Sequence, residues 1–255
     1  MRDAVAVLGA RIDALEWDDA VGRLVAWGSR RQSRTVCICN VHSVVTAAQD
    51  PDFMAVLNGA DMATPDGMPV AWMLRLLGRR GQQRINGPDL MWRYLAEAER
   101  LGQVVSFYGS TEPTLARLRE AMQRAFPALR LGEMISPPFR ALNAAEEQAH
   151  RERIEACGTA VLFVGLGCPK QERWMAAQRG RLQAVMVGVG AAFDYHAGTI
   201  RRAPTWMQRH GLEWLHRLAS EPRRLWRRYL VTNSLYVWLA TKQLLTAARG
   251  SRRSP

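Results

Sequence analysis

The sequence predicts an α/β fold, in which a parallel β-sheet carries helices on both faces and is followed by a basic helical appendage. Three observations support this prediction. Short apolar runs alternate with helix-like segments over the first 200 residues, which is typical of strand–helix–strand crossovers. Several of these runs are apolar at successive positions, as strands covered on both faces are. Basic residues, in contrast, are concentrated after residue 200.

Seven apolar runs are predicted strands. In chain order they are Ala4–Leu8, Thr35–Asn40, Ala60–Thr64, Gln103–Tyr108, Leu129–Met134, Ala160–Val164 and Ala184–Val187. Most of the connections are long enough to hold a helix, and parallel strands require such crossovers. The sequence therefore predicts a Rossmann-like parallel sheet.

The segments between the strands carry the apolar spacing and the end signals of helices. The predicted helices are Asp18–Arg31, His42–Gln49, Pro51–Asn58, Met68–Leu77, Pro88–Leu101, Thr111–Phe126, Ala144–Cys157 and Lys170–Gln178. We expect a break at Asp50, because the residue before a proline disfavours the helical conformation. The domain organisation predicted is a core over residues 1–200 and an appendage over residues 201–255.

Cysteine spacing and apolar run length exclude several other classes of protein. Cys37, Cys39, Cys157 and Cys168 show no zinc-like pairing. Cys37 and Cys39 lie in a predicted strand, so we expect them to be small core residues in a reducing cytoplasm. The N-terminal apolar run is short and is interrupted by charges, which does not fit a signal peptide. No apolar run reaches 18 residues, so no bilayer-spanning helix is expected.

Three strands end in glycine turns that are suited to binding an anion. The clearest is Phe163–Trp174, where a strand leads through a glycine turn into a helix start whose N–H groups can face a phosphate. Val104–Glu112 and Ala184–Asp194 have the same form. Together they predict a crevice at the carboxyl edge of the sheet. The alternative is that the glycines only close ordinary turns.

A carboxylate follows another strand. In Thr64-Pro65-Asp66-Gly67, proline and glycine favour a turn that places Asp66 at the sheet edge among apolar neighbours, where it is a candidate general base. Asp66 could instead form the turn or cap the next helix. Asn40 and His42, at another strand end, could orient a substrate hydroxyl, although His42 could simply begin a helix.

The charge is distributed unevenly. The net charge is +12, and residues 201–255 hold 12 basic and 2 acidic residues. Arginines there alternate with tryptophan and tyrosine, which favours an anionic membrane surface. Tyr229–Leu245 is a predicted amphipathic helix suited to the membrane interface. The alternatives are a nucleic-acid patch, disfavoured because no reading module is present, and a face that forms a homo-oligomer.

Six motifs carry a resemblance to a known family. They are TPDGMPVAW (64–72), RINGPDLM (84–91), FYGSTEP (107–113), FVGLGCPKQE (163–172), VGVGAAFDYHAGTIRRAP (187–204) and GLEWLHRLASEPRRLWRRY (211–229). In order and spacing they resemble the WecG/TagA/CpsF family of bacterial glycosyltransferases. The resemblance implies inverting, metal-independent transfer from a UDP-sugar to a sugar on a polyprenyl diphosphate. It also implies a role in making cell-surface polysaccharide or exopolysaccharide.

The resemblance implies that Asp66 is the base, that Gln171 binds the donor and that the basic tail reaches the lipid diphosphate. The resulting hypothesis has three groups of residues. The catalytic residues are Asp66 and Asn40; the donor-binding residues are Gly109, Ser110, Gly165, Gly167, Lys170, Gln171, Gly188, Gly190 and Asp194; the acceptor- or diphosphate-binding residues are His42, Arg84, Arg201, Arg202, Arg217, Arg223, Arg224, Arg227 and Arg228. No metal ion and no cofactor is expected.

The predicted partners are a nucleotide-sugar donor, a polyprenyl-diphosphate-linked acceptor and an anionic membrane surface. The expected location is peripheral, on the cytoplasmic face of the inner membrane. A dinucleotide-binding oxidoreductase is rejected, because Gly165-Leu-Gly167-Cys-Pro-Lys lacks the third glycine of that fingerprint. The alternative function is a non-catalytic, membrane-associated scaffold that binds nucleotide-sugar.

Overall fold

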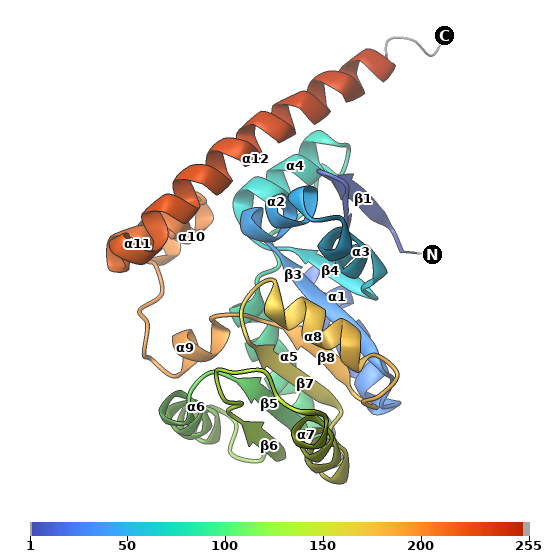
Figure 1. Ribbon diagram of the computed structural model, residues 1–255, viewed down its shortest axis with the longest axis vertical. Helices are drawn as coiled ribbons and strands as arrows, with labels where there is room; N and C mark the ends of the chain where they lie inside the picture. The colour runs from blue at the N-terminus through green and yellow to red at the C-terminus, as the bar shows by residue number, and fades with distance from the viewer. Residues whose placement is uncertain (1, 252–255) are drawn as a thin grey trace.

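A six-stranded parallel sheet forms the centre of the molecule (Figure 1). The computed structural model describes residues 2–251, apart from the side chains at positions 224, 228, 250 and 251. The strands lie in the order β4 (Met62–Pro65), β3 (Arg34–Cys39), β8 (Val185–Gly188), β7 (Val161–Gly165), β5 (Val105–Gly109) and β6 (Leu131–Ile135). Every neighbouring pair in this sheet is parallel, which confirms the predicted fold class.

Helices cover both faces of the sheet. They are α1 (Trp17–Ser29), α2 (Val41–Gln49), α3 (Pro51–Gly59), α4 (Met68–Leu76), α5 (Gly87–Leu101), α6 (Glu112–Ala125), α7 (Ala144–Ala156), α8 (Lys170–Gln178), α9 (Ala192–His196), α10 (Thr205–Arg209), α11 (Glu213–Ser220) and α12 (Pro222–Ser251). All the strands and helices predicted up to residue 187 are present. Their ends differ from the predicted ones by at most a few residues.

Two apolar cores lie on opposite faces of the sheet. Residues of α1, α5, α6 and α9 pack with one set of strand side chains, which includes Val36 and Phe163. Residues of α2, α3, α4 and α8 pack with the alternate set, which includes Cys37 and Leu162. Successive side chains of a strand point to opposite faces. The unbroken apolar runs of the sequence are therefore explained by burial on both faces.

A small antiparallel hairpin was not predicted. It pairs β1 (Ala4–Val7) with β2 (Ala10–Asp13) through a turn at Leu8 and Gly9. Both turn residues have positive φ, 52° and 91°, as a two-residue hairpin turn of this kind requires. The usual signal for such a turn is Asn-Gly or Asp-Gly. Leu-Gly lacks it, which is why the sequence did not reveal the hairpin.

The C-terminal helix runs across the core as well as beyond it (Figure 1). Along its first part, the Tyr236 hydroxyl donates to the Pro69 carbonyl at 2.8 Å. Further along, the Gln243 side chain accepts from the Leu8 amide at 2.8 Å and donates to the Ala6 carbonyl at 2.6 Å. Helix α12 is longer than the predicted 229–245 segment. No helix among residues 2–251 is long and apolar enough to cross a bilayer.

The ends of β5 and β7 approach so closely that only glycine fits between them. Gly109 pairs with Gly165 and has a φ of +124°, and a Cβ atom on it would lie 2.6 Å from the carbonyl carbon and oxygen of Gly165. Gly158 also has a positive φ, +68°, but has open space around it. Comparing alanine substitutions at these two glycines therefore distinguishes the energetic cost of a positive φ from the cost of a steric clash.

We expect Gly109→Ala to lower the free energy of unfolding more than Gly158→Ala does. Both variants carry the cost of a left-handed alanine, roughly 1–2 kcal/mol. Gly109→Ala adds overpacking, which costs about 1–3 kcal/mol more. Urea unfolding of both variants measures the difference. Equal losses would show that the strand ends separate easily.

Candidate active site

A cleft of about 640 Å³ opens at the carboxyl edge of the sheet. Its floor is formed by residues that follow β3, β4 and β8, and its walls come from α4, α11 and α12. Asp66, Arg84, Gly167, Gly188 and Gly190 are among the residues that line it. Residues from both the predicted core and the predicted appendage line this cleft. Ligands of open parallel sheets bind at this edge.

Backbone contacts fix the position of Asp66. Its amide donates to the Cys39 carbonyl at 2.9 Å, so the residue continues the pairing of β3 with β4. The hydroxyl of Thr64 donates to the Ile85 carbonyl at 3.0 Å, which ties the end of β4 to the next loop. Helix α4 has Gly67 as its N-cap and no side-chain cap. The carboxylate of Asp66 does not cap this helix.

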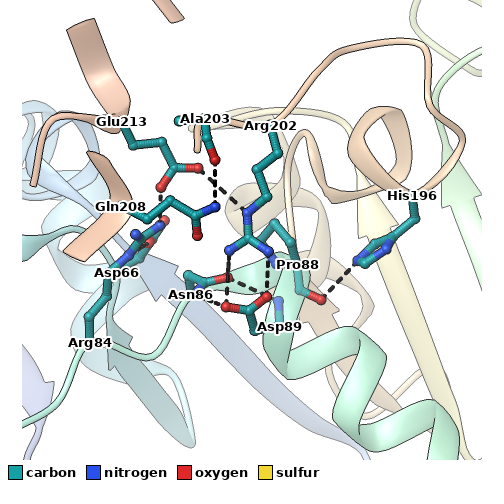
Figure 2. Close-up of polar contacts among 10 residues, drawn as sticks. All are labelled: Asp66, Arg84, Asn86, Pro88, Asp89, His196, Arg202, Ala203, Gln208 and Glu213. Atoms are coloured by element: carbon teal, nitrogen blue, oxygen red, sulfur yellow. Dashed lines mark hydrogen bonds and ion pairs between the residues drawn. The ribbon is translucent and has the colours of Figure 1, made fainter. Parts of the chain in front are cut away.

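Arg84 lies between two carboxylates (Figure 2). Its Nε donates to Oδ1 of Asp66 at 3.2 Å, and its Nη2 donates to Oε2 of Glu213 at 2.5 Å. Burial alone would lower the pKa of Arg84, but the charges of Asp66 and Glu213 outweigh it and raise the pKa. Arg84 therefore stays charged, and it links the sheet edge to α11.

Arg202, an arginine of the tail, is also held by an ion pair. Arg202 makes two hydrogen bonds to the carboxylate of Asp89 and one of 3.2 Å to Oδ1 of Asn86 (Figure 2). Burial raises the pKa of Asp89, but hydrogen bonds from Arg202 and Asn86 reverse this, so the net shift is downward. Nearby, His196 contacts the Pro88 carbonyl at 2.9 Å. Arg202 thus fastens the start of the tail to α5.

Asn40 and His42 both line the cleft. Asn40 is the N-cap of α2, where its side-chain oxygen accepts from the Ser43 amide at 3.1 Å and from the Ser43 hydroxyl at 3.3 Å. His42 lies in the first turn of α2, and its Nδ1 is 3.4 Å from the Thr46 hydroxyl. Asn40 therefore caps α2 and also lines the cleft.

Gln171 is buried beneath the glycine turns. Its Oε1 accepts from the Gly190 amide at 3.1 Å, and its Nε2 donates to Oε1 of Glu172 at 2.9 Å. A Cβ atom on Gly188 would lie 3.1 Å from this Nε2. Gln171 thus orders the turn after β8 as well as lining the cleft.

The other predicted donor residues lie outside the lining of the cleft. Gly109 and Gly165 pair with each other, and Ser110 follows them with a φ of +61°. Lys170 is exposed at the start of α8. Asp194 accepts from Thr199 within the loop after α9. The structure therefore brings together Gly167, Gln171, Gly188 and Gly190 from the predicted donor group.

Of the predicted tail arginines, Arg217 lines the cleft. Its Nε is buried and has no hydrogen-bond partner among the described residues. Arg201 is exposed, and Arg223 and Arg227 are exposed on α12. Arg224 and Arg228 also lie on α12, but their side chains are outside the described part of the structure.

The sequence analysis missed several residues that line the cleft. They are Trp72, Tyr195, Glu213, Trp214, Tyr229, Thr232 and Tyr236. Glu213 could have been identified from the sequence, because it is one of only two acidic residues in positions 201–255. Trp214, Tyr229 and Tyr236 could not, since tryptophan and tyrosine occur throughout positions 201–255.

The fold and the cleft define an α/β protein with a carboxylate and glycine turns at one sheet edge, closed by a basic C-terminal segment. This chain belongs to the glycosyl transferase WecG/TagA/CpsF family, whose model matches residues 5–250. Consistent with this, the chain is a glycosyltransferase. Among residues 2–251, no three His, Cys, Asp or Glu side chains gather in a way that could hold a metal ion.

Two relatives carry the same name, N-acetylglucosaminyldiphosphoundecaprenol N-acetyl-beta-D-mannosaminyltransferase. The protein from Bacillus spizizenii (strain W23) is 35% identical over 185 residues, which cover 72% of this chain and 70% of the relative. The protein from Bacillus subtilis (strain 168) is 30% identical over 192 residues, which cover 75% of this chain and 73% of the relative.

We expect the Glu172 carboxyl to make stability fall as pH rises. Burial raises the pKa of Glu172, and its Oε2 has no hydrogen-bond partner among the described residues. A raised pKa in the folded state means that its stabilising contribution is present at acidic pH and is lost as pH rises through that pKa. Glu172→Gln should therefore gain thermal stability, relative to wild type, between pH 5 and pH 8.

Thermal unfolding at several pH values measures this gain. Glu120→Gln is the matched control, because Glu120 is exposed on α6. A difference between Glu172→Gln and wild type that does not change with pH would contradict the expectation.

Proposed function

We propose that this protein transfers an N-acetylhexosamine from a UDP-sugar to a sugar carried on a polyprenyl diphosphate, as the names of its two relatives suggest. In those names the transferred sugar is N-acetylmannosamine and the acceptor is N-acetylglucosaminyldiphosphoundecaprenol. The observation that carries the proposal is the placement of Asp66 in a cleft beside the glycine turns of β7 and β8. The product would enter cell-surface polysaccharide synthesis.

The chemistry needs one base and a stabilised leaving group. Asp66 accepts the proton of the acceptor hydroxyl while that oxygen attacks the anomeric carbon of the donor. The bond from this carbon to the diphosphate oxygen breaks, and UDP departs with the electron pair. A single displacement of this kind inverts the anomeric configuration.

Two features of the cleft support stabilisation of the departing diphosphate without a metal ion. Gly167 and Gly190 have positive φ values, 79° and 57°, with open space where a Cβ would stand, so a ligand can approach the backbone closely. Arg217 supplies a charged guanidinium with a buried Nε, and positive groups preorganised at a leaving group lower the barrier. Both features lie in the cleft that contains Asp66.

The acceptor also needs room for an apolar chain. Trp72 and Leu76 of α4 and Val237 and Leu244 of α12 line the same cleft. They give the cleft apolar walls on these two helices. An isoprenoid chain would find in this part of the cleft the apolar contacts that a nucleotide does not need.

The exposed face of α12 supports membrane docking. Large apolar side chains there are exposed: Trp226, Leu230, Val231, Val237, Trp238 and Leu245. Arg223 and Arg227 are exposed on the same helix, and Lys242 lies over the Trp238 ring. Apolar and basic groups together favour an anionic lipid interface. We therefore propose that residues 201–255 dock the catalytic core, residues 1–200, on the cytoplasmic face of the membrane.

Asp66→Asn should reduce the turnover rate by roughly 10²–10⁴, because a positioned general base contributes that much. UDP binding should change little, since the glycine turns are unaltered. Transfer from UDP-N-acetylmannosamine to a short-chain polyprenyl diphosphate N-acetylglucosamine measures the rate, and calorimetry measures UDP binding. Asp52→Asn is the control, because Asp52 is exposed on α3. Near wild-type turnover by Asp66→Asn would remove Asp66 from the mechanism.

The joint replacement Arg223→Gln, Arg227→Gln, Trp226→Ser and Trp238→Ser should abolish flotation with anionic vesicles. Each basic residue near such a surface contributes roughly 1 kcal/mol, and the two indoles add apolar burial. Exposed Arg117 and Arg119 of α6, both replaced by Gln, provide the control. If the full-length wild type ignores anionic vesicles at low salt, the docking proposal is wrong.

A further inference from the structure

Glu213 joins the C-terminal helices to the sheet edge through two arginines. Its Oε2 accepts from Nη2 of Arg84 at 2.5 Å, and its Oε1 lies 3.8 Å from Nε of Arg202 (Figure 2). Its side chain is 19% exposed, as is that of Asp66, so both carboxylates are largely shielded from water. Glu213 is the first residue of α11. Its carboxylate is therefore a contact from the tail to a side chain that touches Asp66.

Arg84 is shared between Asp66 and Glu213, and this limits the number of hydrogen bonds that it gives to Asp66. A guanidinium and a carboxylate commonly pair through two parallel hydrogen bonds. Here, within residues 2–251, the hydrogen bond from Arg84 to Asp66 comes from Nε alone, at 3.2 Å and on Oδ1, because Nη2 is directed to Glu213. A carboxylate that is held by one such bond keeps more of its basicity than one that is held by two.

We propose that Glu213 is a positioning residue for the transfer reaction, an inference that rests on the proposed function. It holds Nη2 of Arg84 away from Asp66, so that Oδ2 of Asp66 is left for the acceptor hydroxyl. Because Glu213 belongs to α11, this arrangement is complete only when the C-terminal helices lie against the core.

Other charged and titratable groups also face the cleft around Asp66. They are His42 of α2, Cys168 before α8, Tyr195 of α9, Arg217 of α11, and Tyr229 and Tyr236 of α12. None of these is changed when Glu213 is replaced by Gln. The substitution removes one negative charge near Asp66 and frees Arg84 to pair with Asp66 through two bonds. Both effects make Asp66 a weaker base, so they act in the same direction.

The experiment compares full-length wild type with Glu213→Gln, Glu213→Asp and Glu221→Gln. Glu221 is the matched control, because it is the other acidic residue of positions 201–255 and ends α11. Its replacement gives the tail the same change in charge. Transfer is assayed in detergent with UDP-N-acetylmannosamine and a short-chain polyprenyl diphosphate N-acetylglucosamine, so that membrane docking does not limit the rate.

We expect Glu213→Gln to lower kcat by roughly 10²-fold, as misplaced catalytic groups do, with little change in the donor KM. The acid limb of its pH–rate profile should move to lower pH. Glu213→Asp should recover part of kcat, and Glu221→Gln should resemble wild type.

Two results would overturn the inference while leaving the proposed function intact. One is a Glu213→Gln enzyme as active as Glu221→Gln. The other is a loss of kcat with an unshifted pH profile and a matching loss of thermal stability. That result would show that Glu213 only holds α11 against the core. An inactive wild type would overturn the proposed function itself and this inference with it.

Discussion

The common direction of all six strands is the constraint on which the site depends. Because β3, β4, β7 and β8 are parallel neighbours, the residues that follow them reach the same edge of the sheet. Asp66 follows β4, Asn40 follows β3, and Gly190 lies just beyond β8. These residues are far apart in the chain, and parallel pairing alone brings them to one cleft. An antiparallel arrangement would divide them between two edges.

A run of ion pairs joins the elements that surround the cleft. Alternating acids and bases run from Asp66 through Arg84, Glu213 and Arg202 to Asp89. Each inner member has neighbours of opposite sign, so largely buried charges are compensated. The run begins at the sheet edge, passes through α11 and ends on α5. It therefore joins the C-terminal helices to Asp66 at the sheet edge.

The glycines at the strand ends serve two different purposes. Gly109 is required by packing, since its missing side chain lets β5 approach β7. Gly165 is similar, because a Cβ there would lie 2.8 Å from the Phe193 ring. Gly167 and Gly190 instead have open space and positive φ, which suits a backbone that receives a ligand. Glycines that look alike in sequence thus differ in their surroundings.

The order of strands and helices follows from the sequence, because apolar periodicity and helix end signals are local. Burial of the strands on both faces could also be predicted, since the runs are apolar at successive positions. The placement of Asp66 at a strand end was also predictable, because Thr64-Pro65-Asp66-Gly67 is a local turn pattern. Proline and glycine fix that turn without help from distant residues.

Tertiary structure alone decided which charged residues meet. Arg84 and Arg202 look alike in sequence, yet one contacts Asp66 and the other Asp89. The sequence also presented residues 201–255 as distinct from the core, whereas Tyr236 and Gln243 bond to core carbonyls. The Arg202–Asp89 ion pair and the packing of α12 on the core join residues more than a hundred positions apart. No local pattern encodes such a distance, because it is fixed only when the parallel sheet assembles.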